Sequence, residues 1–371
     1  FIDSSGNIVA VGCAAAASYR GKAKVYQLIN GNWTNLGADI AGETAGERCG
    51  KCVVLNSTGD TIAVSSPTYS SATYSQAGKV RVLKLINGTW TQLGQTFYGE
   101  YADAYLGNKE KSISLNSTGN ILAIGDENNS LSGNGARSGR VRIYQLINQT
   151  WTQIGKDING SNSYYLGGAV SLNDAGDIIS VGAYNATLGG VNNIGLTKVY
   201  KLINGSWTKI GLTIAGDVAG DFSGFCVSTN NMGDIIAIGA RMAASSMSAQ
   251  GLVRVYKLIN ASWTKVGQDI YGEARFDESG ASLSINDAGN IIAIGAHQND
   301  GNGNLSGHVR IYQLINNIWV KIVPDIDGEN ADNLSGISVS LNAAGNIVAI
   351  GAPVNDGGGT YSGHVRVYSI P

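Results

Sequence analysis

The chain has few of the charged residues that mark several common protein classes. Of its 371 residues only 14% are charged, and 25 basic against 27 acidic side chains leave a formal net charge of −2. Average soluble proteins carry about 25% charged residues, and nucleic-acid surfaces need clustered basic side chains. We therefore expect no nucleic-acid partner. No stretch reaches the roughly 20 apolar residues of a membrane-spanning helix, so we expect no membrane insertion in this segment.

Groups that perform catalysis are also scarce. There are three histidines, His297, His308 and His364, and two of them fall at the same point of the repeat described below. No Ser–His–Asp set, paired carboxylates on a unique element, phosphate loop or metal triad stands out. The sequence thus favours a non-enzymatic protein with no required cofactor, and an enzyme acting on a polysaccharide is the less favoured alternative.

What the chain does have is repetition. Its 52 glycines and only 4 prolines are typical of many tight turns between short strands. Six copies of the pattern Leu-Ile-Asn-x-x-Trp recur at intervals of 56 to 61 residues, ending at Trp33, Trp90, Trp151, Trp207, Trp263 and Trp319. A fixed period of this kind indicates a repeat architecture.

Each repeat resolves into four short strands, as residues 281–322 illustrate. The second segment, 290–296, is apolar almost throughout, like a strand buried on both faces. The third, 308–314, alternates in the manner of a half-buried strand. Asn-Gly pairs at 30–31, 87–88 and 204–205 predict type I′ hairpins before the tryptophan strand. One such antiparallel meander cannot bury both faces alone, whereas radial stacking can; an open β-solenoid, the rival fold, usually has shorter repeats.

The predicted fold class is therefore all-β, a seven-bladed β-propeller of four-stranded antiparallel blades forming a single domain over residues 1–371. The second segment occurs seven times and defines blade units of approximately 1–48, 49–107, 108–166, 167–222, 223–278, 279–334 and 335–371. The tryptophan strand occurs only six times, and Phe1-Ile2-Asp3 resembles the tail of an innermost strand. We therefore expect the propeller to be incomplete at its N-terminus, or to be part of a longer repeat array.

The repeat resembles the FG-GAP repeat of integrin α-subunit propellers and related secreted propellers. The residues that carry the resemblance in the last unit are Ser335–Leu341, Gly345–Pro353 and Gly363–Tyr368. It covers essentially all seven units, although Gly-Ala-Pro is complete only at 351–353. The resemblance implies a seven-bladed propeller, extracellular placement, and a role in adhesion or ligand recognition.

One feature of that family does not carry over. Integrin-like units hold calcium in an acidic loop between the first two strands, whereas here this position is a short turn such as 116–119, without the carboxylates that calcium needs. The loops after the second strand, 299–304 and 355–359, each carry one aspartate, Asp300 and Asp356. These loops are candidates for Ca²⁺, but a plain turn is the favoured interpretation.

Acidic residues recur in the loops after the tryptophan strand. They are Asp39, Glu43, Asp157, Asp217, Asp221, Asp269, Glu273, Asp325 and Glu329. They could form an acidic collar for a cation or basic partner. We favour the alternative that they pair with the recurring arginines of the third strands or cap turns: Arg81, Arg142, Arg254, Arg310 and Arg366. Likewise, the repeated tryptophans fit packing better than stacking on sugars.

Two further residue sets bear on an extracellular location. A disulfide between Cys13 and either Cys49 or Cys52 is geometrically feasible and would suit secretion, and we select Cys13–Cys52 as the candidate pair. Glycosylation sequons start in the same hairpin turn of four units, at Asn87, Asn148, Asn204 and Asn260. These asparagines would carry glycans if a eukaryotic source secretes the chain; otherwise they are ordinary turn residues.

We therefore predict an extracellular structural or adhesion module, at the cell surface or in an extracellular assembly, that binds or displays to a protein or polysaccharide partner without catalysis. The alternative is a multivalent carbohydrate-binding lectin with sites between blades. Saturable binding to one sugar type on a glycan array would favour the lectin.

Overall fold

The strands of the chain form seven antiparallel sheets. The computed structural model describes residues 1–371 except 131–132, 245–247 and 360. Apart from strands, the described chain contains one helical turn, α1 (Ala16–Tyr19). The all-β, seven-bladed β-propeller class predicted from the repeat is confirmed.

Each sheet takes its strands from one stretch of sequence. The first sheet contains β1 (Ile8–Cys13), β2 (Lys22–Ile29), β3 (Asn32–Asn35) and β4 (Ile40–Ala41); the second contains β5 (Val53–Leu55), β6 (Thr61–Ser66), β7 (Lys79–Ile86), β8 (Thr89–Gln92) and β9 (Phe97–Tyr98); and the third contains β10 (Ile113–Leu115), β11 (Ile121–Asp126), β12 (Arg140–Ile147), β13 (Thr150–Gln153) and β14 (Ile158–Asn159). The fourth sheet contains β15 (Ala169–Leu172), β16 (Ile178–Ala183), β17 (Leu196–Ile203), β18 (Ser206–Lys209) and β19 (Ile214–Ala215), and the fifth contains β20 (Ser223–Thr229), β21 (Ile235–Ala240), β22 (Leu252–Ile259), β23 (Ser262–Lys265) and β24 (Ile270–Tyr271). The sixth sheet contains β25 (Ser282–Ile285), β26 (Ile291–Ala296), β27 (His308–Ile315), β28 (Ile318–Lys321) and β29 (Ile326–Asp327), and the seventh contains β30 (Ser338–Leu341), β31 (Ile347–Ala352) and β32 (His364–Ser369).

The described chain divides into two compact units. The first contains Phe1–Ile179 and Lys201–Thr208, and the second contains Ser180–Tyr200 and Lys209–Pro371. In the first unit, the chain start adds to its own sheet, because Ile2 bridges to Val9 and the Phe1 ammonium lies 3.0 Å from the Ala10 carbonyl oxygen. In the second unit, the final sheet contains three strands, β30 to β32.

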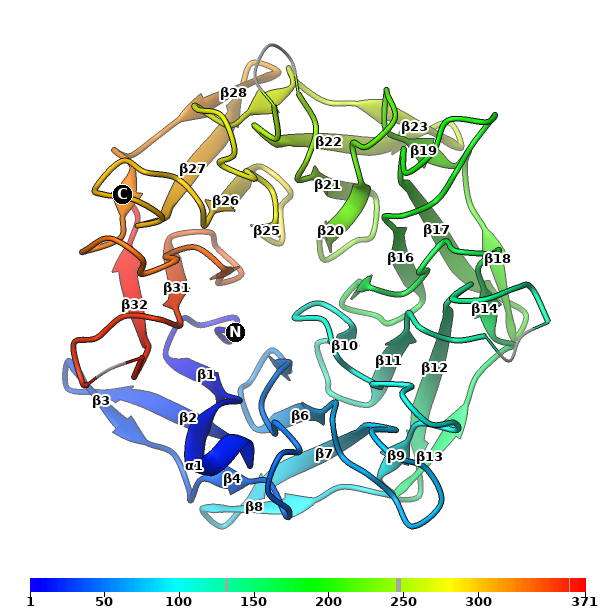
Figure 1. The fold of residues 1–371 in the computed structure, drawn as a ribbon, viewed down its shortest axis with the longest axis vertical. Coiled ribbons are helices and arrows are strands. Elements are labelled where there is room, and N and C mark those ends of the chain that lie inside the picture. The colour runs from blue at the N-terminus through cyan, green and yellow to red at the C-terminus, as the bar shows by residue number, and fades with distance from the viewer. Residues whose placement is uncertain (131–132, 245–247, 360) are drawn as a thin grey trace. The chain divides into compact units, whose positions relative to one another are not determined.

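Most sheets contain one strand more than the four predicted. In the third sheet, β10, β11, β12 and β13 follow one another as a meander (Figure 1). The tryptophan strand β13 pairs only with the second half of β12, and the two-residue β14 pairs with Arg140 and Val141 at its start. The fifth strand arises because an eight-residue third strand is twice as long as its four-residue partner, which leaves backbone donors and acceptors for the returning chain to pair.

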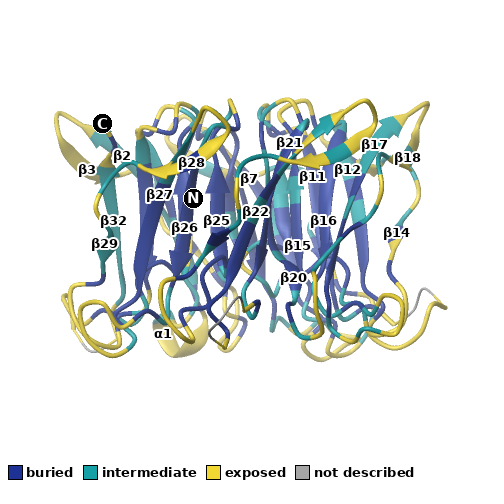
Figure 2. Ribbon diagram, turned by 90° about the horizontal axis from the view of Figure 1, so that it is seen from above, coloured by how far each residue is buried: buried dark blue, intermediate teal, exposed yellow. Residues whose placement is uncertain are grey.

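Burial follows the predicted order of the strands. All six residues of β11 are buried, as are those of β6, β16 and β21. Three of the four residues of β13 are exposed, and the same contrast separates β26 from β28 in Figure 2. The second strands therefore form the centre of the core, as their mostly apolar sequence predicts.

The turn between the first two strands is closed by an asparagine. Asn116 Oδ1 accepts hydrogen bonds from the backbone N–H groups of Asn120 (3.0 Å) and Ile121 (2.8 Å). Buried asparagines hold the same position in five other sheets: Asn56, Asn173, Asn230, Asn286 and Asn342. Because the side-chain amide satisfies the turn by itself, this position is a structural turn, as its short length predicts.

Five of the six tryptophans connect consecutive sheets. Trp151 donates its indole N–H to the Leu93 carbonyl oxygen of the preceding sheet at 2.8 Å, and Trp319 donates to Val266 at 2.9 Å. Trp90, Trp207 and Trp263 make equivalent bonds. A Cβ atom on Gly94 would lie 2.5 Å from the Trp151 ring, so glycine is required where the ring rests. These contacts favour packing over sugar stacking; Trp33 is the most exposed of the six, at 36%.

Candidate functional site

A recurring arginine–acid contact joins consecutive sheets within each unit. Arg142 in β12 lies 2.7 Å from Glu100, which follows β9 in the preceding sheet. The equivalent pairs are Arg81–Glu43, Arg254–Asp217, Arg310–Glu273 and Arg366–Glu329. We call each such position, with the strand ends around it, an inter-sheet station and name it by its arginine. The predicted arginine–acid pairing is thereby confirmed. Because these acids are paired, less unpaired negative charge is left to bind a cation or a basic partner.

The Arg142 station contains additional buried charge. Asp126 ends β11 and is 3% exposed, and Arg140 begins β12 opposite it in the register. Arg140 lies 3.2 Å from Asp126, 2.9 Å from Glu100 and 3.5 Å from Asp157. The Tyr101 hydroxyl donates to Asp126 Oδ1 at 2.8 Å. Two guanidinium groups and three carboxylates thus form one paired network at the edge of the buried strands.

The pKa values of two acids in this network shift in opposite directions, although burial favours the neutral form of both. Burial raises the pKa of Asp126, in spite of the hydrogen bonds from Tyr101 and Arg140. For Glu100, burial also favours the neutral form, but hydrogen bonds from Arg142 and Arg140 outweigh it and lower the pKa. Burial and the neighbouring Asp126 raise the pKa of the Tyr101 hydroxyl, which therefore stays protonated as a donor.

A cavity of about 200 Å³ opens at the Arg142 station. Its lining combines aromatic and aliphatic side chains with the charged network: Thr96, Phe97, Tyr98, Leu106, Ile124, Asp126, Arg140, Arg142 and Tyr144. The Phe97 and Tyr144 ring centroids are 4.6 Å apart, and Tyr98 is 48% exposed. The cavity therefore has apolar walls and a few convergent polar groups, which is typical of a small-molecule binding site.

The Arg254 station has the same plan but almost no cavity. Ala240 replaces the aspartate and Leu252 replaces the first arginine, and the space left is about 10 Å³. Arg254 donates to Asp217 Oδ1 at 2.9 Å and to Asp269 Oδ1 at 3.0 Å. The hydrogen bonds from Arg254 lower the pKa of Asp269 to about 2. This station is a closed structural contact.

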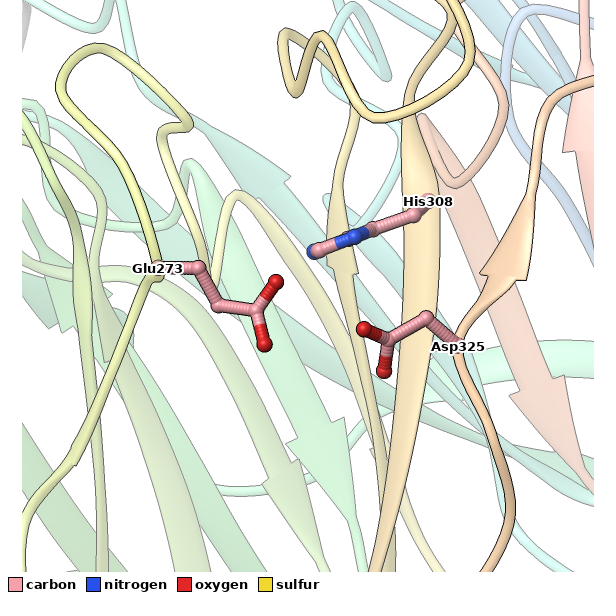
Figure 3. Close-up of side chains that lie close together, drawn as sticks. All are labelled: Glu273, His308 and Asp325. Atoms are coloured by element: carbon pink, nitrogen blue, oxygen red, sulfur yellow. The ribbon is translucent and has the colours of Figure 1, made fainter.

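The Arg310 station brings a histidine to two carboxylates. Glu273, His308 and Asp325 each offer a ligand atom, and these atoms lie within 4.8 Å of one another. In Figure 3 the two carboxylates face each other and the imidazole extends above them. His308 begins β27, is 1% exposed, and has its pKa lowered by burial and by Arg310. Glu273, His308 and Asp325 form the only cluster of three potential metal ligands in the described part of the chain.

The calcium candidates Asp300 and Asp356 are engaged within their own loops. Asp300 Oδ1 accepts from the Leu305 N–H at 2.8 Å, and Asp356 Oδ1 accepts from the Tyr361 N–H at 2.6 Å. The preceding asparagines, Asn299 and Asn355, accept in the same way from Gly301 and Gly357. These contacts support the plain-turn interpretation, and calcium binding there stays a prediction.

The cysteines do not form the candidate disulfide in this structure: all four are free thiols. Cys52 Sγ lies 3.1 Å from the Glu110 carbonyl oxygen, on the side of the following sheet, whereas Cys13 ends β1 in the preceding sheet. The Cys13–Cys52 pairing is therefore not made, because Cys52 faces away from its proposed partner. Burial raises the pKa of Cys52 to about 12, so its thiol is an inert core group.

The four sequon asparagines lie where the repeat predicts. Asn87, Asn148, Asn204 and Asn260 are exposed in the hairpin before the tryptophan strand. Their φ angles are 48°, 48°, 49° and 48°, the left-handed conformation that this turn requires. Each side chain is therefore accessible, and glycosylation itself stays a prediction.

Sequence reasoning missed the charged network at the Arg142 station. Glu100 follows Trp90 at the spacing by which Glu43 follows Trp33, so the repeat could have identified it. The signal for Asp126 is a charged residue at the end of an apolar strand, where four other sheets have alanine: Ala183, Ala240, Ala296 and Ala352. Both signals required comparing units position by position.

Comparison with known proteins supports the fold alone. A candidate 6-phosphogluconolactonase from Bacteroides uniformis is 11% identical, with 98% of this chain and 92% of that chain covered and a TM-score of 0.64. Hydrazine synthase of Kuenenia stuttgartiensis is 9% identical, with 99% and 94% covered and a TM-score of 0.60. No protein-family model and no curated protein sequence matches the chain. FG-GAP therefore remains a resemblance, whereas the seven-bladed propeller fold is shown.

No helix among the described residues is long and apolar enough to span a bilayer.

Proposed function

We propose that this chain is a non-catalytic, extracellular binding module for a polysaccharide partner. The observation that carries the proposal is the cavity of about 200 Å³ at the Arg142 station, with aromatic walls and convergent polar groups. Pockets for drug-sized ligands occupy about 300–1,000 Å³, so this cavity matches a single sugar residue of a longer chain.

The charges of the station favour an uncharged sugar. Arg140 and Arg142 are already paired with Glu100, Asp126 and Asp157 at 2.7 to 3.5 Å. An anionic sugar would have to compete with these acids for the guanidinium groups. A neutral sugar can instead use the remaining hydrogen-bonding capacity of the network and stack against an aromatic side chain.

The same pairing supports a non-catalytic role. A general acid or base needs a carboxyl that can approach the substrate and exchange its proton near the working pH. Here Asp126 accepts from Tyr101, Asn129 and Arg140, which leaves it poorly suited to proton transfer. The phosphogluconolactonase-like neighbour shares 11% identity, which supports no transfer of its named activity. We propose an extracellular location because exposed sequon hairpins recur in four sheets.

Unequal stations favour a single binding site over a multivalent lectin. The cavity at the Arg142 station has a volume of about 200 Å³, whereas the one at the Arg254 station has about 10 Å³, although both stations have the same backbone plan. A lectin with repeated sites would require equivalent open cavities at successive stations.

The first test is sugar binding by the intact chain and by Tyr98→Ala. Neutral mono- and polysaccharides are screened on a glycan array, and positives are measured by calorimetry. We expect saturable binding to one neutral sugar type, weakened about fivefold to tenfold in Tyr98→Ala because a stacking contact is lost. The matched control is Tyr271→Ala, which removes the equivalent tyrosine of β24 at the Arg310 station.

Two results would overturn the proposal. One is the absence of binding to any neutral sugar, and the other is equal weakening by Tyr98→Ala and Tyr271→Ala. New reducing ends released from a polysaccharide panel by the intact chain would overturn its non-catalytic part.

A further inference from the structure

We propose that Glu273, His308 and Asp325 bind a divalent transition-metal ion of the Zn²⁺ type at the Arg310 station. Zn²⁺ is bound by thiolate sulfur, imidazole nitrogen and carboxylate oxygen, and its open sites combine three protein ligands with a water molecule. The three residues provide one nitrogen and two carboxylates, from β27 and from the loops on either side of it.

The buried histidine is the observation that points to a ligand. His308 is 1% exposed, and its Nε2 atom is buried without a hydrogen-bond partner. Its Nδ1 atom lies 3.9 Å from Asp327 Oδ1, which is too far for a hydrogen bond. A buried imidazole nitrogen without a hydrogen-bond partner costs folding free energy unless something binds it.

The ligand atoms lie near enough to one another for side-chain rotation to form a zinc site. Around a tetrahedral ion with bonds of about 2.0–2.1 Å, ligand atoms are about 3.3–3.4 Å apart. The three atoms here lie within 4.8 Å of one another, so a modest rotation of the carboxylate side chains brings them together. The Glu273 side chain is 44% exposed, so it can make this adjustment at the cost of its contact with Arg310, while His308 is buried. Figure 3 shows the three side chains.

The Arg254 and Arg310 stations differ in how the arginine contacts the two acids. There, one guanidinium bonds both carboxylates of the pair, Asp217 and Asp269. At the Arg310 station, Arg310 donates to the Tyr271 carbonyl oxygen at 2.7 Å. Of the two acids, it contacts Glu273 alone, at 3.4 Å. The cation that faces both acids is Lys321, which lies 2.9 Å from Asp325 and 3.9 Å from Glu273.

Lys321 is a replaceable counter-ion. Its side chain is 39% exposed, so its ammonium can move into solvent when a metal ion binds. Removing Lys321 should therefore strengthen metal binding, because the ion no longer has to displace a competing charge.

The test uses Co²⁺ as a spectroscopic probe and Zn²⁺ in calorimetry, on the intact chain. We expect visible absorption typical of a nitrogen- and oxygen-bound Co²⁺ with one ion per chain, displaced by Zn²⁺. His308→Leu should abolish the signal, because Leu252 occupies the same position in β22 and shows that the fold accepts leucine there. Lys321→Met should tighten binding about twofold to fivefold, the value of one exposed ion pair.

A matched variant controls for metal bound elsewhere. His364→Ala removes the histidine at the equivalent position of β32 and should leave the affinity unchanged. Should His308→Leu fail to fold, Glu273→Gln alters only an exposed ligand and should weaken binding at least tenfold. The proposal is overturned by the absence of a Co²⁺ or Zn²⁺ signal in the intact chain, or by an equal signal in His308→Leu or in Glu273→Gln.

Discussion

The Arg142 and Arg254 stations share one backbone plan and differ in what fills it. Asp126 and Arg140 are paired in the register at the ends of β11 and β12, as Ala240 and Leu252 are in β21 and β22. The first pair is charged and borders a cavity of about 200 Å³, whereas the second is apolar and leaves about 10 Å³. The two stations therefore differ in charge and in cavity volume while the strand register around them is the same.

The largest expected effect comes from breaking the charged pair. Arg140→Leu leaves Asp126 buried without its guanidinium partner, and an uncompensated buried charge costs about 3–5 kcal/mol. We expect the free energy of unfolding in urea to fall by that amount. A loss below about 1 kcal/mol would show that the hydrogen bonds from Tyr101 and Asn129 are enough to stabilise the carboxyl.

The matched control converts one station into the other. Asp126→Ala with Arg140→Leu reproduces the alanine–leucine pair of the Arg254 station, so no buried charge is left unpaired. We expect the double variant to be more stable than Arg140→Leu alone, which is the non-additivity typical of contacting residues. Additive losses would contradict a direct Asp126–Arg140 coupling.

The next effect is a pH dependence at the Arg254 station. The pKa of Asp269 is lowered to about 2 by hydrogen bonds from Arg254, so folding favours its ionised form. This stabilisation is complete above the unfolded pKa of about 4 and is lost as the pH falls through about 2. Asp269→Asn should therefore cost about 1 kcal/mol at neutral pH, after allowance for solvent screening, and flatten the stability curve in acid.

The corresponding variant at the Arg142 station is Asp157→Asn. Its carboxylate lies 3.5 Å from Arg140, which has two other acidic partners. We expect a smaller loss of unfolding free energy than for Asp269→Asn. An equal loss would mean that the two stations do not distribute charge differently.

The smallest effect concerns Lys265. Its ammonium lies 2.7 Å from Asp269, but its side chain is 44% exposed, and such surface pairs contribute about 0.2–1 kcal/mol. Lys265→Ala should lower the free energy of unfolding by a few tenths of a kcal/mol in urea denaturation. A loss as large as that of Asp269→Asn would show that Lys265, and not Arg254, is the main stabilising partner of the Asp269 carboxylate.

Much of the fold could be predicted from particular residues. The mostly apolar segment 290–296 predicts the buried β26, and the Asn-Gly pair at 87–88 predicts the hairpin between β7 and β8. The short strands such as β14 were not predicted, because two residues carry no periodic pattern. Their pairing depends on the length by which the third strand exceeds the tryptophan strand.

The candidate sites were harder to predict. Tyr101 and Asp126 are 25 residues apart and meet only because their sheets are neighbours. Cys13 and Cys52 fitted a disulfide on the repeat, yet Cys52 Sγ turns to Glu110 of the following sheet. Side-chain direction at a junction between sheets depends on both surfaces, and a single repeat describes only one of them.

The amino-acid pattern was sufficient for the number of repeats, the meander within each, the tight turns and the arginine–acid partnership, because these depend on local periodicity that recurs along the chain. The cavity, the unsatisfied imidazole of His308 and the position of Lys321 between two carboxylates emerge only when consecutive sheets are packed together. The physical reason is that volume, burial and charge balance at a junction are properties of two facing surfaces, and small exchanges such as Asp126 for alanine alter them without disturbing either meander.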